Sequence, residues 1–292
     1  MAWNDPLTTH LLDFLFELEK NGLKTPQTIA GGFGLFLKRR YLNERKERTL
    51  FDIHGARSTE DIDIFVRIDI LCDMQQVRSI LNALHDLGYE VVEEAKYMQW
   101  KKQIEHWEQA GFIKMDFLVK NVDAHRKDLH IKGIRARNPH VEGFHAHITP
   151  EALFIDEKTL EIPLSGKRGN GEEYETTIRI PHPFNYLIMK LFAFRDRQND
   201  SDKQQGSYHA FDVFSIIGSL TERELHEAIE FVKNHTQEPV IQDTKQIVKN
   251  CFTGTSPSGM IAIKTHRMFQ DFGTEHYEDF LKILTEIFGI IP

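Results

Sequence analysis

The chain has 292 residues, of which 40% are apolar and 27% charged, and its formal net charge at pH 7 is −8. This ordinary globular composition excludes disordered, collagen-like and low-complexity proteins, and the length fits about two domains of ~150 residues. The acidic balance disfavours a generally basic nucleic-acid binder, although a local basic patch can still hold a polyanion.

The sequence gives no sign of a membrane or secreted protein. No apolar run approaches the ~20 residues that span a bilayer, and the first ten residues, MAWNDPLTTH, have neither a basic nor an apolar signal-peptide region. Cys72 and Cys251 are far apart and form no Cys-x-x-Cys pair, so neither a disulfide scaffold nor a cysteine zinc site is expected. We therefore expect a protein of the reducing cytoplasm with no membrane partner.

The first residues predict a helix, a short strand and a second helix. Asp5-Pro6 is typical of a helix start, and leucines at helical spacing follow it for about four turns. A short apolar stretch at 28–30 comes next, then Gly31-Gly32, then a helical pattern from Phe33. Two glycines are therefore predicted between a strand and a helix.

The next elements alternate between strand and helix patterns. Residues 43–60 are polar and predict a loop, and residues 61–66 begin with the alternation of a strand. A helix is predicted over 77–88, and the segment 97–109 fits helix and strand equally well. Residues 112–119, FIKMDFLV, predict a strand with one acid inside it.

The pattern changes after residue 120. Residues 120–182 contain short β-like pieces and the glycine-rich turn GKRGNG, whereas helical patterns dominate beyond Pro183. We expect an α+β chain in which residues 1–150 form the core, 151–182 a β-hairpin and connecting segment, and 183–292 a helical domain. An active cleft is expected between the core and the helical domain.

Three aspartates are the strongest candidates for chemistry. Asp61 and Asp63 are two positions apart on a predicted strand, so both side chains leave the same face. Two carboxylates this close repel each other unless a cation or a proton lies between them. Asp116 lies inside another apolar strand, where an acid is costly unless it is paired or bound to metal. If the two strands are neighbours, the three carboxylates converge on a Mg²⁺ (or Mn²⁺) site.

Such a site suits phosphoryl or nucleotidyl transfer. Two ions about 4 Å apart can hold the attacking and leaving oxygens, and the third carboxylate can accept the proton of the attacking hydroxyl. The glycines Gly31 and Gly32 would let a phosphate approach the backbone at a helix N-terminus. GGFGLFLK lacks the ending of a Walker A loop, and it does not match the dinucleotide-binding fingerprint. The simpler alternative is a pair of surface acids at a strand edge.

The order of these residues resembles the nucleotidyltransferase superfamily of the polymerase β type. That superfamily has a Gly-Gly or Gly-Ser turn, an acid-x-acid strand and a later strand acid, which correspond here to 31–32, RSTEDIDIF at 57–65 and Asp116. The motif Arg-Ser-Thr-x-Asp-Ile-Asp is similar to that of the AbiEii-like branch, which comprises the toxins of type IV toxin–antitoxin systems. The resemblance implies a small mixed sheet flanked by helices, followed by a helical domain, with Arg57 and Thr59 shaping the nucleotide-binding loop.

A second match lies in the helical part. KLFAFRDR, from Lys190 to Arg197, is similar to a helix of that branch, and the two cations are seven residues apart on one helix face. The resemblance implies that they hold the triphosphate, with Asp212 as a further nucleotide-binding residue. His209 stands where the branch has an acid. The alternative for Lys190 and Arg197 is a solvated helix stripe.

The resemblance implies transfer of a nucleoside monophosphate from an NTP to a hydroxyl. In toxins of this branch the acceptor is thought to be RNA, often tRNA, and a separate antitoxin is expected. Two other functions stay open. An acidic chain also suits a small cationic acceptor of the antibiotic type, and a chain with this fold can be a non-catalytic protein that binds nucleotide.

Two other clusters of basic side chains have both a functional and a simpler interpretation. Residues 38–48, KRRYLNERKER, hold six basic and two acidic side chains. They are either a solvated helix end or a rim that faces phosphate or RNA. His140, His145 and His147 lie within eight residues, but no carboxylate or cysteine completes a zinc site. We expect a polar hairpin surface there.

Overall fold

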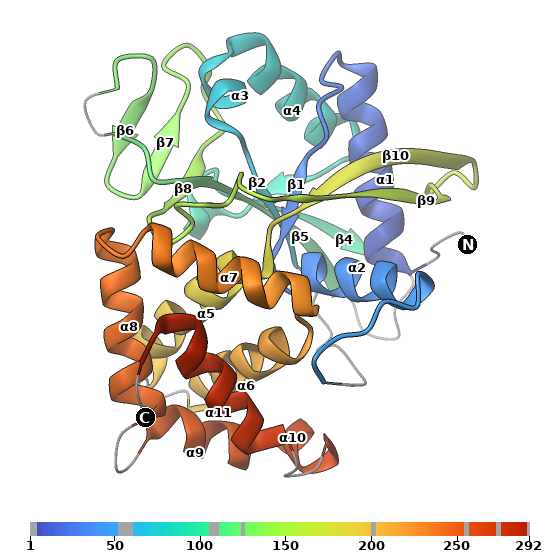
Figure 1. Cartoon of the computed structure of the whole chain (residues 1–292). Coiled ribbons are helices and arrows are strands. Elements are labelled where there is room, and N and C mark those ends of the chain that lie inside the picture. The colour runs from blue at the N-terminus through green and yellow to red at the C-terminus, as the bar shows by residue number, and fades with distance from the viewer. Residues whose placement is uncertain are drawn as a thin grey trace. The chain divides into compact units, whose positions relative to one another are not determined.

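The chain divides into a unit built on a β-sheet and a helical unit (Figure 1). The computed structural model describes residues 5–51, 61–104, 111–123, 126–199, 203–253, 257–272 and 276–290. Unit 1 comprises Met1–Lys38 and Ala56–Pro181, and unit 2 comprises Arg39–Gly55 and His182–Pro292. The fold class is α+β, with a mixed sheet in unit 1 and helices in unit 2.

Unit 1 is built on a sheet with ten strands among its described residues, in the order β6-β7-β8-β5-β2-β1-β10-β9, with β4 also on β5 and β3 on β4. The strands are β1 (Thr28–Ala30), β2 (Asp61–Phe65), β3 (Glu90–Val91), β4 (Gln99–Ile104), β5 (Gly111–Lys120), β6 (His130–Lys132), β7 (Arg135–Arg137), β8 (Ala146–Thr149), β9 (Leu160–Lys167) and β10 (Glu173–Ile180). The sheet is mixed because β2 and β8 run parallel to β5 and β10 runs parallel to β1, whereas the other pairs are antiparallel.

The central strand β5 has three neighbours. One of its edges pairs with β2 along residues 114–118. The other edge is shared, because β4 pairs with residues 111–116 and β8 pairs with residues 118–120. This arrangement places Asp116 at the end of the β4 ladder, just before β8 begins.

The helices of unit 1 include two whose first turn is capped by an aspartate, Asp5 or Asp73. The helices of this unit are α1 (Pro6–Lys20), the first part of α2 (Gly31–Glu44), α3 (Ile68–Cys72), α4 (Met74–Asp86) and the short 3₁₀ helix η1 (Glu93–Ala95). The predicted helix after Asp5 is confirmed, since the Asp5 carboxylate accepts a 2.9 Å hydrogen bond from the Thr8 amide. Its apolar face packs on the sheet, where the rings of Phe14 and Phe117 are 6.0 Å apart.

The two faces of the sheet differ in character. On β2 the side chains of Ile62 and Ile64 are buried, and on β5 those of Met115 and Phe117 are buried. Because side chains alternate along a strand, the aspartates of both strands project from the opposite face. The apolar face forms the core beneath α1, and the other face carries the candidate site.

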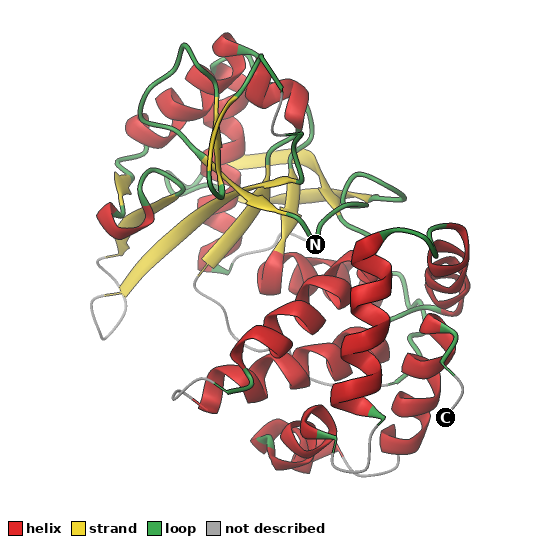
Figure 2. Ribbon diagram, turned by 90° about the vertical axis from the view of Figure 1, so that its left-hand side faces the viewer, coloured by secondary structure: helices red, strands yellow, loops and turns green. Residues whose placement is uncertain are grey.

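Unit 2 is helical, as the sequence predicts for residues beyond Pro183 (Figure 2). Its helices are α5 (Pro183–Arg197), α6 (Lys203–Gly218), α7 (Glu222–Asn234), α8 (Pro239–Phe252), α9 (Ser258–Thr265), α10 (Arg267–Phe272) and α11 (Tyr277–Phe288). Phenylalanines from several of these helices form its core, for example Phe214, whose ring lies 5.3 Å from that of Phe280. The sequence pattern predicts helices over about 184–197, 209–218, 221–235, 239–252 and 274–288, and so it does not predict α9 and α10.

The unit boundaries differ from the predicted ones. Residues 39–55 belong to unit 2, because the amides of Leu50 and Phe51 donate to the carbonyls of Leu220 and Gly218 at 2.8 and 3.0 Å. The β-hairpin predicted within 151–182 is formed by β9 and β10, and it is part of the sheet of unit 1 because β10 pairs with β1. No helix in the described ranges is both long and apolar enough to cross a membrane.

Candidate active site

A row of polar side chains crosses the sheet on its less buried face. In the parallel pair of β2 and β5, Asp63 lies opposite Asp116. On the next strand Gln99 lies opposite Asp116, and on the other side Ala30 lies opposite Asp63. Residues paired in this way project to one face, and Asp61, two positions from Asp63, shares it. The two aspartate-bearing strands are therefore neighbours, the arrangement on which the predicted site depends.

Asp116 is held by a neighbour on β4. Its Oδ1 atom accepts a 2.6 Å hydrogen bond from Nε2 of Gln99. Burial raises the pKa of Asp116 to about 6; the hydrogen bond from Gln99 opposes this rise and the negative charge of Asp61 adds to it. Gln99 lies in the segment 97–109, whose secondary structure is ambiguous in the sequence. Sequence reasoning therefore gives no reason to single it out.

Asp63 lies directly against Gly31, the first residue of α2. A β-carbon on Gly31 would lie 1.6 Å from Oδ2 of Asp63, and the φ of Gly31 is +62°, a conformation that favours glycine. The carboxylate thus lies at a helix N-terminus, where free amides and the helix dipole favour negative charge. The glycine that was predicted to make room for a phosphate makes room here for Asp63.

Asp61 lies near a lysine of the neighbouring strand. Its Oδ1 atom is 3.9 Å from Nζ of Lys114, and the side chains of Asp61 and Lys114 are 45% and 40% exposed. A pair this long and this exposed contributes little to stability. Each aspartate therefore has a different neighbour, and no three His, Cys, Asp or Glu side chains among the described residues come close enough together to hold a metal ion.

The chemistry of the donors nevertheless fits a divalent cation. Carboxylate oxygens are the ligands that Mg²⁺ and Mn²⁺ prefer. The negative charge of Asp61 raises the pKa of Asp116, and a cation between the two would relieve that repulsion. Asp61, Asp63 and Asp116 share one face, but their side chains would have to rotate away from Lys114, Gly31 and Gln99 to bind one ion.

The predicted triphosphate-binding residues lie in unit 2. Nζ of Lys190 on α5 is 2.7 Å from Oδ2 of Asp212 on α6, with side chains 17% and 13% exposed. Nη1 of Arg197 lies 3.3 Å from Nε2 of His209. The structure thus brings Lys190 and Arg197 to one face of α5, as their spacing predicts, and that face packs on α6. Arg57 and Thr59 lie outside the described residues.

The basic segment 38–48 is largely neutralised or buried. Lys38 is buried, and burial lowers the pKa of Arg39. Arg40 and Arg45 form ion pairs with Glu44 and Glu47 at 3.5 and 3.2 Å. The predicted phosphate-facing rim is therefore not a row of free cations.

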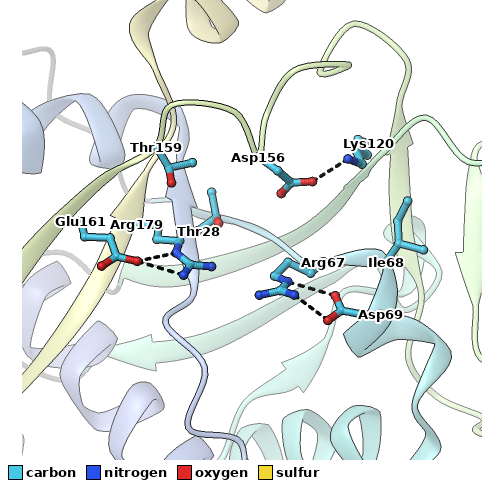
Figure 3. Close-up of a pocket in the computed structure, with 9 residues that line it drawn as sticks. All are labelled: Thr28, Arg67, Ile68, Asp69, Lys120, Asp156, Thr159, Glu161 and Arg179. Atoms are coloured by element: carbon cyan, nitrogen blue, oxygen red, sulfur yellow. Dashed lines mark hydrogen bonds and ion pairs between the residues drawn. The ribbon is translucent and has the colours of Figure 1, made fainter.

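A polar cavity of about 530 Å³ opens on the same face of the sheet (Figure 3). Three ion pairs line it, Arg67–Asp69 and Lys120–Asp156 at 2.7 Å and Arg179–Glu161 at 2.9 Å. Lys120 lies four positions beyond Asp116 on β5, so both side chains project from one face. The residues that line the cavity come from segments far apart in the chain, which is why no local motif in the sequence predicts it.

No protein-family model matches this chain, and a search of curated proteins found no match either.

Proposed function

We propose that the protein is a metal-dependent nucleotidyltransferase that moves a nucleoside monophosphate from an NTP to a hydroxyl acceptor. One observation carries the proposal. Asp63 and Asp116 lie opposite each other on neighbouring parallel strands, with Asp61 two positions away on the same face. A glycine at the strand-to-helix turn, Gly31, adjoins Asp63. Buried or half-buried acids are rarely placed side by side without a cation or a proton between them.

Each residue has a role in this proposal. Asp61, Asp63 and Asp116 would hold Mg²⁺ or Mn²⁺, which when bound neutralises triphosphate charge and polarises the reacting phosphoryl group. Asp116, with a pKa of about 6, can be deprotonated at neutral pH and still accept a proton from the acceptor hydroxyl. Oδ2 is the atom suited to accept it, because Oδ1 accepts the bond from Gln99. Gly31 and Gly32 would line the phosphate pocket once the side chain of Asp63 has turned away from Gly31 to bind the ion.

The AbiEii-like toxin assignment is part of this proposal and rests on the sequence resemblance. It implies an RNA or tRNA acceptor, a cytoplasmic location and a separate antitoxin. It also implies that Lys190, Arg197 and Asp212 contribute to NTP binding. Arg197 contacts His209, and an imidazole at this position brings no negative charge to offset that of the arginine, as the acid of the branch would.

The test is transfer of label from α-labelled NTPs to total RNA and to small hydroxyl compounds. The variant Asp63→Asn should lose at least about 100-fold in transfer, because it removes a charged ligand while nearly keeping its shape. Asp86→Asn is the matched control, an exposed acid at the end of α4. Chelation of divalent cations should stop transfer. Full transfer by Asp63→Asn would refute the proposed site.

A small-molecule acceptor is the second candidate, and the polar cavity favours it. Three cations and three acids around about 530 Å³ suit a zwitterionic compound rather than a chain of phosphates. Label on the small compound and none on RNA would select this version.

A non-catalytic nucleotide-binding protein is the third candidate. It is favoured by the different directions of the three aspartates, toward Lys114, Gly31 and Gln99. Calorimetric titration with Mg²⁺ and NTPs decides it, because tight binding without product on any acceptor would support this candidate.

A further inference from the structure

A cluster of basic side chains lies on the β6–β7 hairpin of unit 1. His130 pairs across the hairpin with Arg137, and Lys132 pairs with Arg135. Together with His145, which precedes β8, these four residues line a small depression of about 170 Å³. We call the five residues the hairpin surface.

The charge of the hairpin surface is not balanced by acids. Within the part of the chain that the structure describes, none of its five residues forms an ion pair with a carboxylate. Arg137 donates instead to the backbone carbonyls of Asn138 and Pro139 at 3.0 and 3.2 Å, which leaves its charge uncompensated. Burial lowers the pKa of His145, and the positive charges of Arg135, Arg137 and His130 lower it further. A local positive field thus exists on a chain whose net charge is −8.

An exposed aromatic ring adjoins the cations. Tyr97 is 45% exposed, and its ring lies edge-on to that of His145 at 5.5 Å. The His145 amide donates to the carbonyl of Tyr97 at 3.0 Å, and its Nδ1 lies 2.9 Å from the carbonyl of Lys96. Both Lys96 and Tyr97 have left-handed φ angles, of +47° and +71°. Two consecutive residues of this kind cost about 1–2 kcal/mol each, so the turn that presents Tyr97 is maintained against strain.

The hairpin surface shares a face of the sheet with the aspartates. Arg135 lies opposite His147 of β8, and His147 lies opposite Leu118 of β5. Leu118 is two positions from Asp116, so all these side chains project from one face. With about 4.8 Å between neighbouring strands, β7 lies about 10 Å from β5, a distance that one or two nucleotides span.

From these observations we propose that the hairpin surface binds single-stranded nucleic acid, with phosphates against Lys132, Arg135 and Arg137 and a base stacked on Tyr97. Sites for single-stranded nucleic acid combine two features: cations that bind the sugar-phosphate backbone, and an exposed aromatic ring on which any base can stack. An acidic protein partner would use the cations but not the ring. The bound strand is the acceptor only if the proposed transferase function holds; the binding itself does not depend on it.

The test is fluorescence anisotropy of a labelled RNA oligonucleotide of about 12 nucleotides with the full chain, over a range of salt concentrations. The double variant Arg135→Ala/Arg137→Ala should bind about 10- to 100-fold more weakly and reduce the slope of log affinity against log salt by about 1.4. Arg78→Ala/Arg223→Ala is the matched control, because it removes two exposed arginines elsewhere. The control should bind like the wild type.

The ring is tested separately. Tyr97→Leu should weaken binding about 10-fold with the salt slope unchanged, whereas Tyr97→Phe should keep wild-type affinity. Tyrosine, leucine and phenylalanine are all unbranched at the β-carbon, so the backbone strain at this left-handed position is similar in the wild type and both variants. A DNA oligonucleotide of the same length shows whether the 2′-hydroxyl contributes.

Several results would overturn the proposal. One is that neither oligonucleotide binds at low salt. Another is that the arginine double variants of the hairpin and of the control lose the same amount of affinity. A third is that poly-glutamate competes with RNA as well as unlabelled RNA does, while Tyr97→Leu has no effect on binding. Binding without any transfer activity would remove the proposed transferase function alone, and transfer to RNA with unchanged binding by the hairpin variant would remove this inference alone.

Discussion

Oδ2 of Asp63 lies 1.6 Å from the point where a β-carbon on Gly31 would be. The two residues therefore determine each other's positions at the start of α2. Any side chain at residue 31 must displace the carboxylate, and the φ of +62° adds strain to that displacement.

The variant Gly31→Ala is expected to lower the free energy of unfolding by about 1–3 kcal/mol, because it combines left-handed strain with a clash. Urea denaturation measures it. Gly88→Ala is the matched control, with φ of +73° and open space around its β-carbon. The control should show the strain alone, and equal losses in both variants would mean that Asp63 moves away without cost.

The stability of the protein should depend on the ionisation of Asp116. Its pKa of about 6 exceeds the 3.8 of a free aspartate, mainly through burial. The folded state therefore binds the proton more tightly, and this stabilisation is complete below pH 4 and lost as the pH rises through 6. With EDTA present, Asp116→Asn should be more stable than wild type at pH 8 by about 1–2 kcal/mol, allowing for solvent screening. The two proteins should be equally stable at pH 4, and a less stable variant at pH 8 contradicts the assigned cause.

Gln99 should hold the pKa of Asp116 down. Its amide donates to Oδ1 and so favours the ionised carboxylate. In Gln99→Leu the pKa should rise by about one unit, as the carboxyl-carbon chemical shift of Asp116 would report during a pH titration. Gln103→Leu, at an exposed position of the same strand, is the control and should leave the titration unchanged.

The ion pair between Lys190 and Asp212 should be coupled more strongly than a surface pair, because both side chains are mostly buried. Lys190→Met should cost about 2–3 kcal/mol of unfolding free energy, since it leaves the carboxylate without its cation. Lys190→Met/Asp212→Leu should recover at least half of that loss. Lys20→Met removes an exposed lysine paired with Glu17 and should change stability little. If the double variant loses as much unfolding free energy as Lys190→Met and Asp212→Leu lose together, the coupling is contradicted.

The sequence predicts local features well and long-range ones less so. Alternation in DIDIF predicts that Asp61 and Asp63 share a face, and both strands that carry the aspartates are found where the pattern predicts them. That Asp63 lies opposite Asp116 depends on pairing between segments about 50 residues apart, which periodicity does not encode. The spacing of Lys190 and Arg197 predicts a shared helix face, but only the packing of α6 on α5 reveals that Asp212 and His209 lie opposite them.

The basic residues show the same difference between local features, which the sequence predicts, and long-range features, which it does not. Residues 38–48 are the most cationic stretch of sequence, yet burial and local ion pairs neutralise much of it. The hairpin surface combines four residues of 130–137 with His145, and the exposed ring of Tyr97 lies beside it, an arrangement that no single window of the sequence contains. Whether a cation is balanced depends on which acids the fold brings near it.

The path of the chain has a practical consequence for dissecting the protein. The polypeptide leaves unit 1 at Lys38, re-enters it at Ala56 and departs again after Pro181, so no single cut yields two intact pieces. A fragment ending at Pro181 would retain Phe51 but lose Phe214, whose ring lies 5.9 Å from that of Phe51. The fragment would expose an aromatic surface that is prone to aggregation. Separate production of the sheet unit therefore requires excision of 39–55 and a short linker in its place.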